Sequence, residues 1–303
     1  MKLLPLSNIK RRFNNKKVYK KGCFMVYNWS ETVYNNSMLK DYLHNQIIQY
    51  HPQTIRQLYY RCLGMGLGVE KDTGVSRSNY TKAFNQLKAL RNSGEIPYSW
   101  IIDPGRYPLT TPTWNSSAEF LEEQLEQYRY SPWEDNHVVQ VWTESKGLAE
   151  VIRQACSHYC VTLIPCGGQP SDSIMDNAIQ RVPTHATKLD LLYIGDYDDA
   201  GLVIANTVSD KVYRHLEDQG KSPDVTFKRI GITPAQIQEY NLPTHYAAKA
   251  KVKTKIKWKV EAEAMPVQTM ISIVRAELDR LEPDLEHAAE MTTAGRDRLK
   301  SLL

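Results

Sequence analysis

The sequence predicts an α/β protein in which a doubly wound parallel sheet follows a smaller helical domain. Over residues 137–245, short apolar strands alternate with segments that have one apolar helical face. This alternation is typical of βαβ units, in which each helix returns the chain so that the next strand runs parallel to the last. The expected strands are 138–143, 160–165, 189–195 and 225–230, and the expected helices between them are 147–156, 173–180 and 202–216.

Residues 30–108 predict the smaller domain. Thr54 is a good N-cap for a helix that begins at Ile55, where apolar side chains recur at helical spacing. A second helix is expected over 78–92, and the segment 96–102 favours a strand or an extended wing. Two helices followed by an extended element is the order of a winged-helix (CAP-like) module.

Three further segments complete the chain. Residues 1–29 form a basic arm, and 109–136 form a linker that becomes helical over 117–128. Residues 246–303 begin as a basic strand and continue as a helical region, because Pro266 precedes an apolar stripe at helical spacing. No apolar run approaches the length of a membrane span, and the apolar start is too short for a signal peptide, so we expect an intracellular protein.

Positive charge is concentrated at two places, although the net charge is only +4. Residues 1–25 hold eight Lys or Arg and residues 249–259 hold six Lys, with no acid in either segment. The lysines of the second segment occupy every other position, so an extended strand would carry them on one face. Such a row predicts a nucleic-acid channel, and a strand edge blunted by lysines is the alternative. Its members include Lys249, Lys251, Lys253, Lys255 and Lys257.

Acidic side chains follow two of the predicted strands. Glu144 comes directly after the first strand, and Asp196 and Asp198 come after the third. Functional groups of a parallel sheet gather at the carboxyl ends of its strands, and carboxylate oxygens are the ligands that Mg²⁺ prefers. We therefore expect these three residues to hold Mg²⁺, with Mn²⁺ as an alternative. The plainer interpretations are an acidic turn for Asp198 and Asp199, and for Glu144 an acid near a helix N-terminus.

These motifs resemble those of a known family. The segments 144–148, 167–172 and 195–201 resemble the Toprim fold of topoisomerases and primases. The segment 54–61, with Arg56 and the pair Tyr59–Tyr60, resembles the nucleophile helix of the topoisomerase VI A subunit and of its relative that makes meiotic double-strand breaks. The segments 90–97 and 102–103 also fit, and 260–266 looks like a tail motif of the compact Mini-A relatives of mobile elements and viruses. The resemblance covers roughly residues 50–285.

The resemblance implies roles for particular residues. Tyr60 would be the nucleophile, Arg56 would hold the phosphate or the phenolate, and Glu144 would bind metal with the two aspartates and move a proton during religation. Tyr59 would pack in the helical domain, and core packing is the plainer interpretation of both tyrosines. Lys146 and Arg61 would contact DNA. Two departures are that Ser145 stands where the family usually has Lys, and that Asp199 stands where it often has Pro.

The activity implied is that of a type IIB topoisomerase A subunit, which breaks double-stranded DNA through a 5′-phosphotyrosine link in a metal-dependent reaction. The resemblance also implies a homodimer in which the tyrosine of one protomer meets the metal of the other. A separate ATPase B-type subunit is a further partner, and the setting would be the cytoplasm or nucleoid of a prokaryote or virus-infected host. Two other functions stay open: a Toprim nuclease that uses water, and a DNA-binding protein without catalysis.

Overall fold

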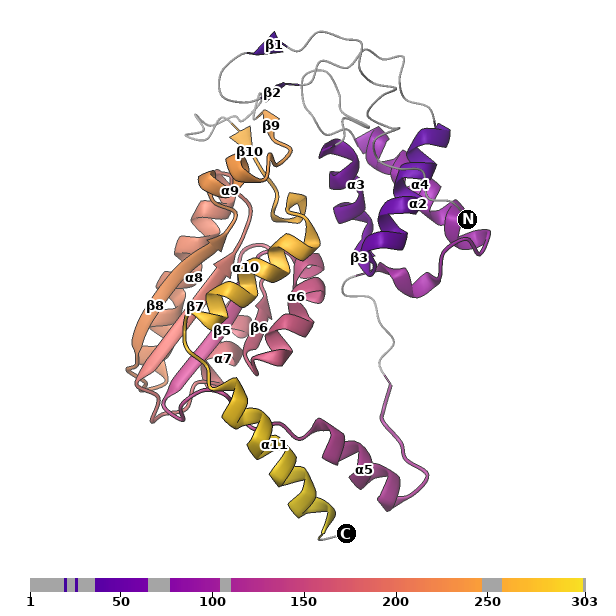
Figure 1. The fold of residues 1–303 in the computed structure, drawn as a ribbon. Helices are drawn as coiled ribbons and strands as arrows, with labels where there is room; N and C mark the ends of the chain where they lie inside the picture. Colours follow the sequence, from indigo (N-terminus) through magenta and orange to yellow (C-terminus); the bar gives the residue numbers. More distant parts are fainter. Residues whose placement is uncertain are drawn as a thin grey trace.

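The structure is a computed structural model that describes residues 36–64, 77–103, 110–246 and 258–301, and two short strands before them (Figure 1). Those strands are β1 (Tyr19–Lys20) and β2 (Met25–Val26), which pair antiparallel. Most of the predicted basic arm lies outside the described residues. The predicted lysine row at Lys249, Lys251, Lys253, Lys255 and Lys257 also lies outside them.

A four-stranded parallel sheet forms the centre of the larger unit. Its strands are β5 (His137–Thr143), β6 (Thr162–Pro165), β7 (Lys188–Ile194) and β8 (Asp224–Gly231). Their order across the sheet is β6-β5-β7-β8, and every neighbouring pair is parallel, with Val141 opposite Leu192 in the centre. The α/β class and the four expected strands are therefore confirmed.

Helices cover both faces of this sheet, as the alternation of strand and helix predicted. The helices α6 (Lys146–His158) and α10 (Val267–Asp279) pack on one face, and α7 (Asp172–Gln180) and α8 (Asp199–Asp218) pack on the other. Successive strand residues point to opposite faces. Accordingly, Val141 belongs to the core beneath α6 and α10, and its neighbour Trp142 belongs to the core beneath α7 and α8.

The smaller unit is helical and lies beside the sheet unit (Figure 1). It consists of α2 (Asn36–Tyr50), β3 (Gln53–Thr54), α3 (Ile55–Gly64), α4 (Arg77–Asn92), the 3₁₀ turn η2 (Tyr98–Trp100) and β4 (Ile101–Ile102). The helices expected from Ile55 and over 78–92 are both present.

The predicted wing over 96–102 is wrong in extent. Only Ile101 and Ile102 form a strand, which pairs parallel with β3, and the residues before them turn as η2. The turn is stabilised by Trp100, whose ring stacks on His51 with centroids 4.1 Å apart. Apolar content alone does not separate a turn whose aromatic ring stacks on a neighbour from an extended strand.

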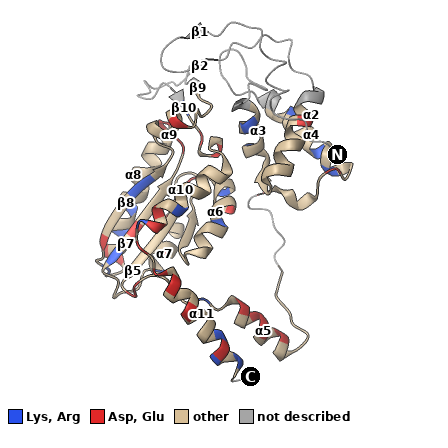
Figure 2. Cartoon of the chain, viewed as in Figure 1, with Lys and Arg blue, Asp and Glu red and all other residues tan. Residues whose placement is uncertain are grey.

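A helical pair extends from the amino-terminal edge of the sheet. The helices α5 (Ser117–Gln127) and α11 (Leu285–Lys300) lie together at the end of the molecule far from α3 (Figure 1). The helix expected over 117–128 is thus confirmed. It carries four Glu and no Lys or Arg, so a polyanion would be repelled from it (Figure 2).

The remaining elements are short. They are α9 (Pro234–Glu239), β9 (His245–Tyr246), β10 (Trp258–Lys259) and the 3₁₀ turn η3 (Ala262–Ala264). The strands β9 and β10 pair antiparallel, and η3 contacts both α3 and α6. Within the described part of the chain, no helix has the length and apolar character needed to cross a membrane.

Candidate metal edge and tyrosine helix

The helix α3 carries the predicted nucleophile and begins with a reciprocal cap. The main-chain N–H of Gln57 donates to Thr54 Oγ1 (3.1 Å), and the N–H of Thr54 donates to Gln57 Oε1 (2.9 Å). This arrangement satisfies two donors that would otherwise lack partners at a helix start. It fixes where the helix begins, and therefore which of its side chains face the sheet unit.

Both tyrosines of the pair are buried. The side chain of Tyr59 is 2% exposed and packs edge-to-face on Tyr80, with ring centroids 5.4 Å apart. Tyr60 is 3% exposed, but its hydroxyl meets charged groups. The two neighbours thus occupy different environments: Tyr59 is a packing residue, and Tyr60 has polar partners at the boundary with the sheet unit.

The partners of Tyr60 are Arg56 and Glu261. Arg56 Nη2 lies 2.5 Å from Glu261 Oε2, and both side chains hydrogen-bond to the Tyr60 hydroxyl. Burial raises the pKa of Tyr60 above its ordinary value, and the charge of Glu261 raises it further, while Arg56 acts in the opposite direction. The hydroxyl is therefore protonated in this arrangement, and its proton points to a carboxylate.

The three predicted metal ligands lie at adjacent strand ends, and we call them the acidic edge (Glu144, Asp196 and Asp198). Glu144 Oε2 accepts a hydrogen bond from the N–H of Asp196 (3.1 Å), which joins the ends of β5 and β7. Asp198 Oδ1 accepts from the N–H of Gly201 (2.7 Å) and caps α8, and its Oδ2 lies 3.2 Å from Lys259 Nζ. The three residues thus lie at the carboxyl ends of neighbouring parallel strands, as the parallel arrangement of the sheet predicted.

The acidic edge holds more negative charge than its surroundings neutralise. Burial raises the pKa of Asp196 to about 7, and the carboxylates of Glu144, Glu261 and Asp198 add to the rise. The pKa of Glu144 is also raised, chiefly by burial. Arg229 offsets part of this charge, and it is close enough to donate a hydrogen bond to the carbonyl oxygen of Asp196 (2.6 Å). Crowded carboxylates of this kind favour a bound cation.

The donor chemistry of the acidic edge fits Mg²⁺ or Mn²⁺, because all three side chains offer carboxylate oxygens. In the present arrangement protein groups engage those oxygens, since Asp196 Oδ1 accepts from the N–H of Ala262 (2.8 Å) and Lys259 pairs with Asp198. Accordingly, no three His, Cys, Asp or Glu side chains among the described residues are spaced to hold a metal ion. A cation would have to displace Lys259 and draw the carboxylates together.

One segment, residues 258–265, connects the acidic edge to the tyrosine helix, and we call it the strap. Its Val260 exchanges two main-chain hydrogen bonds with Tyr197 (2.8 and 3.1 Å). The buried carboxylate of Glu263 accepts from Thr54 Oγ1 (3.1 Å) and from Ser145 Oγ (2.6 Å), so it joins the starts of α3 and α6. The strap therefore touches both halves of the proposed site.

Lys259 is the last lysine of the row predicted to line a nucleic-acid channel, and in the structure it pairs with Asp198. The strap residues Glu261 and Glu263 were not among the functional residues expected from the sequence. The tail motif over 260–266 was a signal for them, because acid alternates with small residues there. That pattern does not predict which residues each acid contacts, because those residues lie far away in the sequence.

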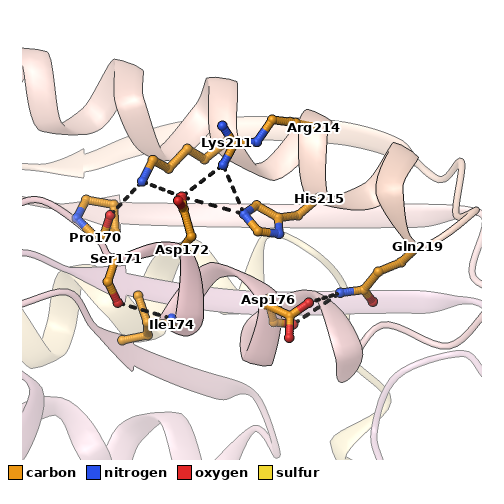
Figure 3. A network of polar contacts seen from close by, with 9 residues as sticks. All are labelled: Pro170, Ser171, Asp172, Ile174, Asp176, Lys211, Arg214, His215 and Gln219. Carbon is orange, nitrogen blue, oxygen red and sulfur yellow. Dashed lines mark hydrogen bonds and ion pairs between the residues drawn. The ribbon is translucent and has the colours of Figure 1, made fainter.

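The predicted turn over 167–172 is anchored inside the sheet unit (Figure 3). Asp172 Oδ1 accepts from Lys211 Nζ (2.7 Å) and Arg214 Nη2 (2.9 Å), and Lys211 also donates to the carbonyl oxygen of Pro170 (2.9 Å). Hydrogen bonds from Lys211 lower the pKa of Asp172. These contacts fasten the turn to α8, so Asp172 has a structural role and does not join the acidic edge.

The two other predicted DNA contacts differ in their surroundings. Lys146 is exposed, and its side chain passes over Gly167, whose φ of +67° and lack of a side chain permit the approach. Arg61 is directed into the helical unit, where Nε donates to Gln53 Oε1 (3.0 Å) and the guanidinium stacks 4.3 Å from the centre of the Tyr50 ring. Lys146 is thus the better placed of the two to meet a phosphate.

Neither a scan against models of protein families nor a search of curated proteins finds a match for this chain.

Proposed function

We propose that this chain is a DNA transesterase of the topoisomerase VI A type, with a winged-helix tyrosine domain and a Toprim metal domain. The observation that carries the proposal is the strap, because a single segment contacts both Tyr60 and the acidic edge. A segment that holds a nucleophile and cation-binding carboxylates in one place is expected where both act on the same substrate. Phosphoryl transfer to the tyrosine gives both groups a role.

Each side chain has a part in the proposed reaction. Tyr60 Oη attacks a DNA phosphorus and becomes linked to the 5′ side of the break, and a 3′-hydroxyl is released. Arg56 supplies charge to the phosphate, because it lies one helical turn before Tyr60 and already donates to its oxygen. Glu144, Asp196 and Asp198 would hold Mg²⁺ or Mn²⁺, which supplies stabilisation of the negative charge that develops at the phosphate.

The reaction requires a local opening. Since only 3% of Tyr60 is exposed, a phosphodiester reaches its hydroxyl after α3 and the sheet unit move apart on one side. Glu263 and Glu261 make polar contacts between the units, which water and phosphate can replace. Buried apolar residues of both units also form one continuous cluster, so the opening has to be confined to the polar side around Tyr60.

The proposed substrate is double-stranded DNA, bound with the help of Lys146 and the lysine row. Arg61 would join them only after its guanidinium leaves Gln53 and Tyr50. We further propose a homodimer that cuts both strands, working with a separate ATPase B-type subunit in the cytoplasm or nucleoid of a prokaryote or virus-infected host. The acidic helix α5 would face away from the DNA, because it extends from the opposite edge of the sheet.

The test is cleavage of supercoiled plasmid with Mg²⁺ or Mn²⁺, stopped with detergent and treated with protease. The expected product is linear or nicked DNA whose 5′ ends carry peptide. Tyr60→Phe should abolish the covalent product, and Tyr59→Phe is the matched control because its ring packing is retained. Failure of every metal condition to yield protein-linked DNA would contradict the proposal.

The burial of Tyr60 favours one alternative, a nuclease that uses water and the acidic edge alone. That enzyme would still cut DNA after Tyr60→Phe and would leave no peptide on the ends. A DNA-binding protein without catalysis would bind in a salt-sensitive manner and would cut under none of the metal conditions.

A further inference from the structure

Glu261 is the acid that faces the Tyr60 hydroxyl across the boundary between the two units. Its Oε2 lies 2.5 Å from Arg56 Nη2, and the same carboxylate receives the hydrogen bond of the Tyr60 hydroxyl. The neighbouring strap residues hold it in place, since Val260 is bonded to Tyr197 on one side and Ala262 to Asp196 on the other. The main chain on both sides of Glu261 is therefore held, and the ion pair with Arg56 orients its carboxylate.

We propose that Glu261 is a further catalytic residue, the base that accepts the proton of Tyr60 when the tyrosine attacks DNA. The inference rests on the proposed function and adds a fourth acid with a role distinct from the acidic edge. Geometry separates the two roles: Glu261 contacts the nucleophile and its arginine, and Glu144 is bonded to the main chain of Asp196.

The step balances with the side chains of Tyr60 and Glu261, the DNA phosphate and one water molecule. The Tyr60 O–H bond breaks and its proton passes to a Glu261 carboxylate oxygen, while a bond forms between Tyr60 Oη and phosphorus. The bond between phosphorus and the 3′-oxygen breaks, and that oxygen takes a proton from water to become the 3′-hydroxyl. In religation the protonated Glu261 returns its proton to the departing phenolate.

The surroundings of Glu261 make it a suitable acceptor. Arg56 and Tyr60 face it from α3, Glu144 and Asp196 influence it from the ends of β5 and β7, and Lys259 and Glu263 flank it on the strap. A tyrosine has an ordinary pKa near 10, and burial raises that of Tyr60, so its hydroxyl ionises rarely at neutral pH without help. A positioned acceptor removes that obstacle.

The test is the rate of covalent adduct formation in a single turnover, measured from pH 6 to pH 10 for the wild type and Glu261→Gln. At pH 7 the variant should be slower by about 10²- to 10⁴-fold, the usual contribution of a general base. The deficit should shrink as pH rises, because hydroxide then removes the tyrosine proton. DNA affinity should stay unchanged, and Glu261→Asp should recover part of the rate.

Glu263→Gln is the matched control, because it lies on the same strap and joins Thr54 to Ser145 without receiving the Tyr60 proton. Any loss it shows should be the same at every pH. A Glu261→Gln deficit that is constant with pH, or an unchanged rate, would overturn the assignment of Glu261 while the Tyr60→Phe result still supports the nucleophile. A wild-type adduct that persists in Tyr60→Phe would overturn both.

Discussion

Asp196→Asn should stabilise the metal-free protein, although it removes a proposed metal ligand. The pKa of Asp196 rises from 3.8 to about 7 on folding, a change of about three pH units. Each unit corresponds to about 1.4 kcal/mol, so the ionised carboxylate costs the folded state up to about 4 kcal/mol. The amide of Asn has no charge, and its oxygen can still accept the N–H of Ala262.

The sign of this effect depends on pH. At pH 8 the wild-type carboxylate is ionised in both states, so the folded state bears the full cost and the variant gains most. As pH falls through about 7 the folded wild type takes up a proton, and the advantage of the variant declines until it is lost near pH 4. Urea unfolding with a chelator at several pH values measures this difference.

The control for this experiment is Asp190→Asn, because Asp190 is a buried acid that has a lysine and a histidine as partners. It lies on β7, the strand that Asp196 follows, and is 2.7 Å from His137 Nε2 and 3.2 Å from Lys188 Nζ, so its loss should lower stability. Added Mg²⁺ should stabilise the wild type and not Asp196→Asn. If Asp196→Asn were less stable than the wild type at pH 8 with chelator, the view that the acidic edge lacks counter-charge would be refuted.

Three further outcomes test other parts of the site. Lys259→Met should tighten Mg²⁺ binding in calorimetry by up to about fivefold, because a partly exposed ion pair with Asp198 is worth up to about 1 kcal/mol. Weaker binding would contradict the view that Lys259 and the cation compete for Asp198. Gly201→Ala should lower stability by about 1–3 kcal/mol, since its methyl would overlap a main-chain carbonyl of the acidic edge, whereas helix propensity alone predicts a gain. The family resemblance implies that the tyrosine of one protomer meets the metal of the other, whereas the strap joins both halves within one chain. If the site is assembled within one chain, a mixture of Tyr60→Phe and Glu144→Gln chains should cleave no better than either alone, and recovery of cleavage would show that the protomers exchange these residues.

The sheet and its acids could be predicted from the sequence because their signals are local. Strand and helix periods identify the βαβ order, and the parallel arrangement then places Glu144 and Asp196 at neighbouring strand ends. The helix α2 was missed, because its buried residues Leu39, Leu43 and Ile47 are separated by mostly polar residues in a helix with little apolar contrast. Its place in the helical unit depends on packing against α3 and α4, and not on its own pattern.

The strap could not be predicted, because its role lies in contacts with distant residues. Glu261 meets Arg56, and Glu263 meets Thr54, across more than two hundred positions of the chain. The strap itself contains only a two-residue strand and a 3₁₀ turn, so it has no period to detect. A charged residue in such a segment looks solvent-exposed until the fold supplies its partner.

The strap also makes cation binding and the state of the tyrosine helix depend on each other. A cation at the acidic edge would compete with Lys259 for Asp198, and release of Lys259 would remove a positive charge two residues from Glu261. The hold of Glu261 on Arg56 and Tyr60 would then change, while the main-chain bonds of Val260 to Tyr197 keep the strap on the sheet unit. DNA that draws Arg56 away from Glu261 should change the affinity of the acidic edge for the cation. Because such coupling is reciprocal, the cation should change the affinity for DNA by the same factor. Titrations of Mg²⁺ with and without a short duplex, using a cleavage-deficient Tyr60→Phe protein, measure that factor, and equal affinities would show that the strap carries no coupling.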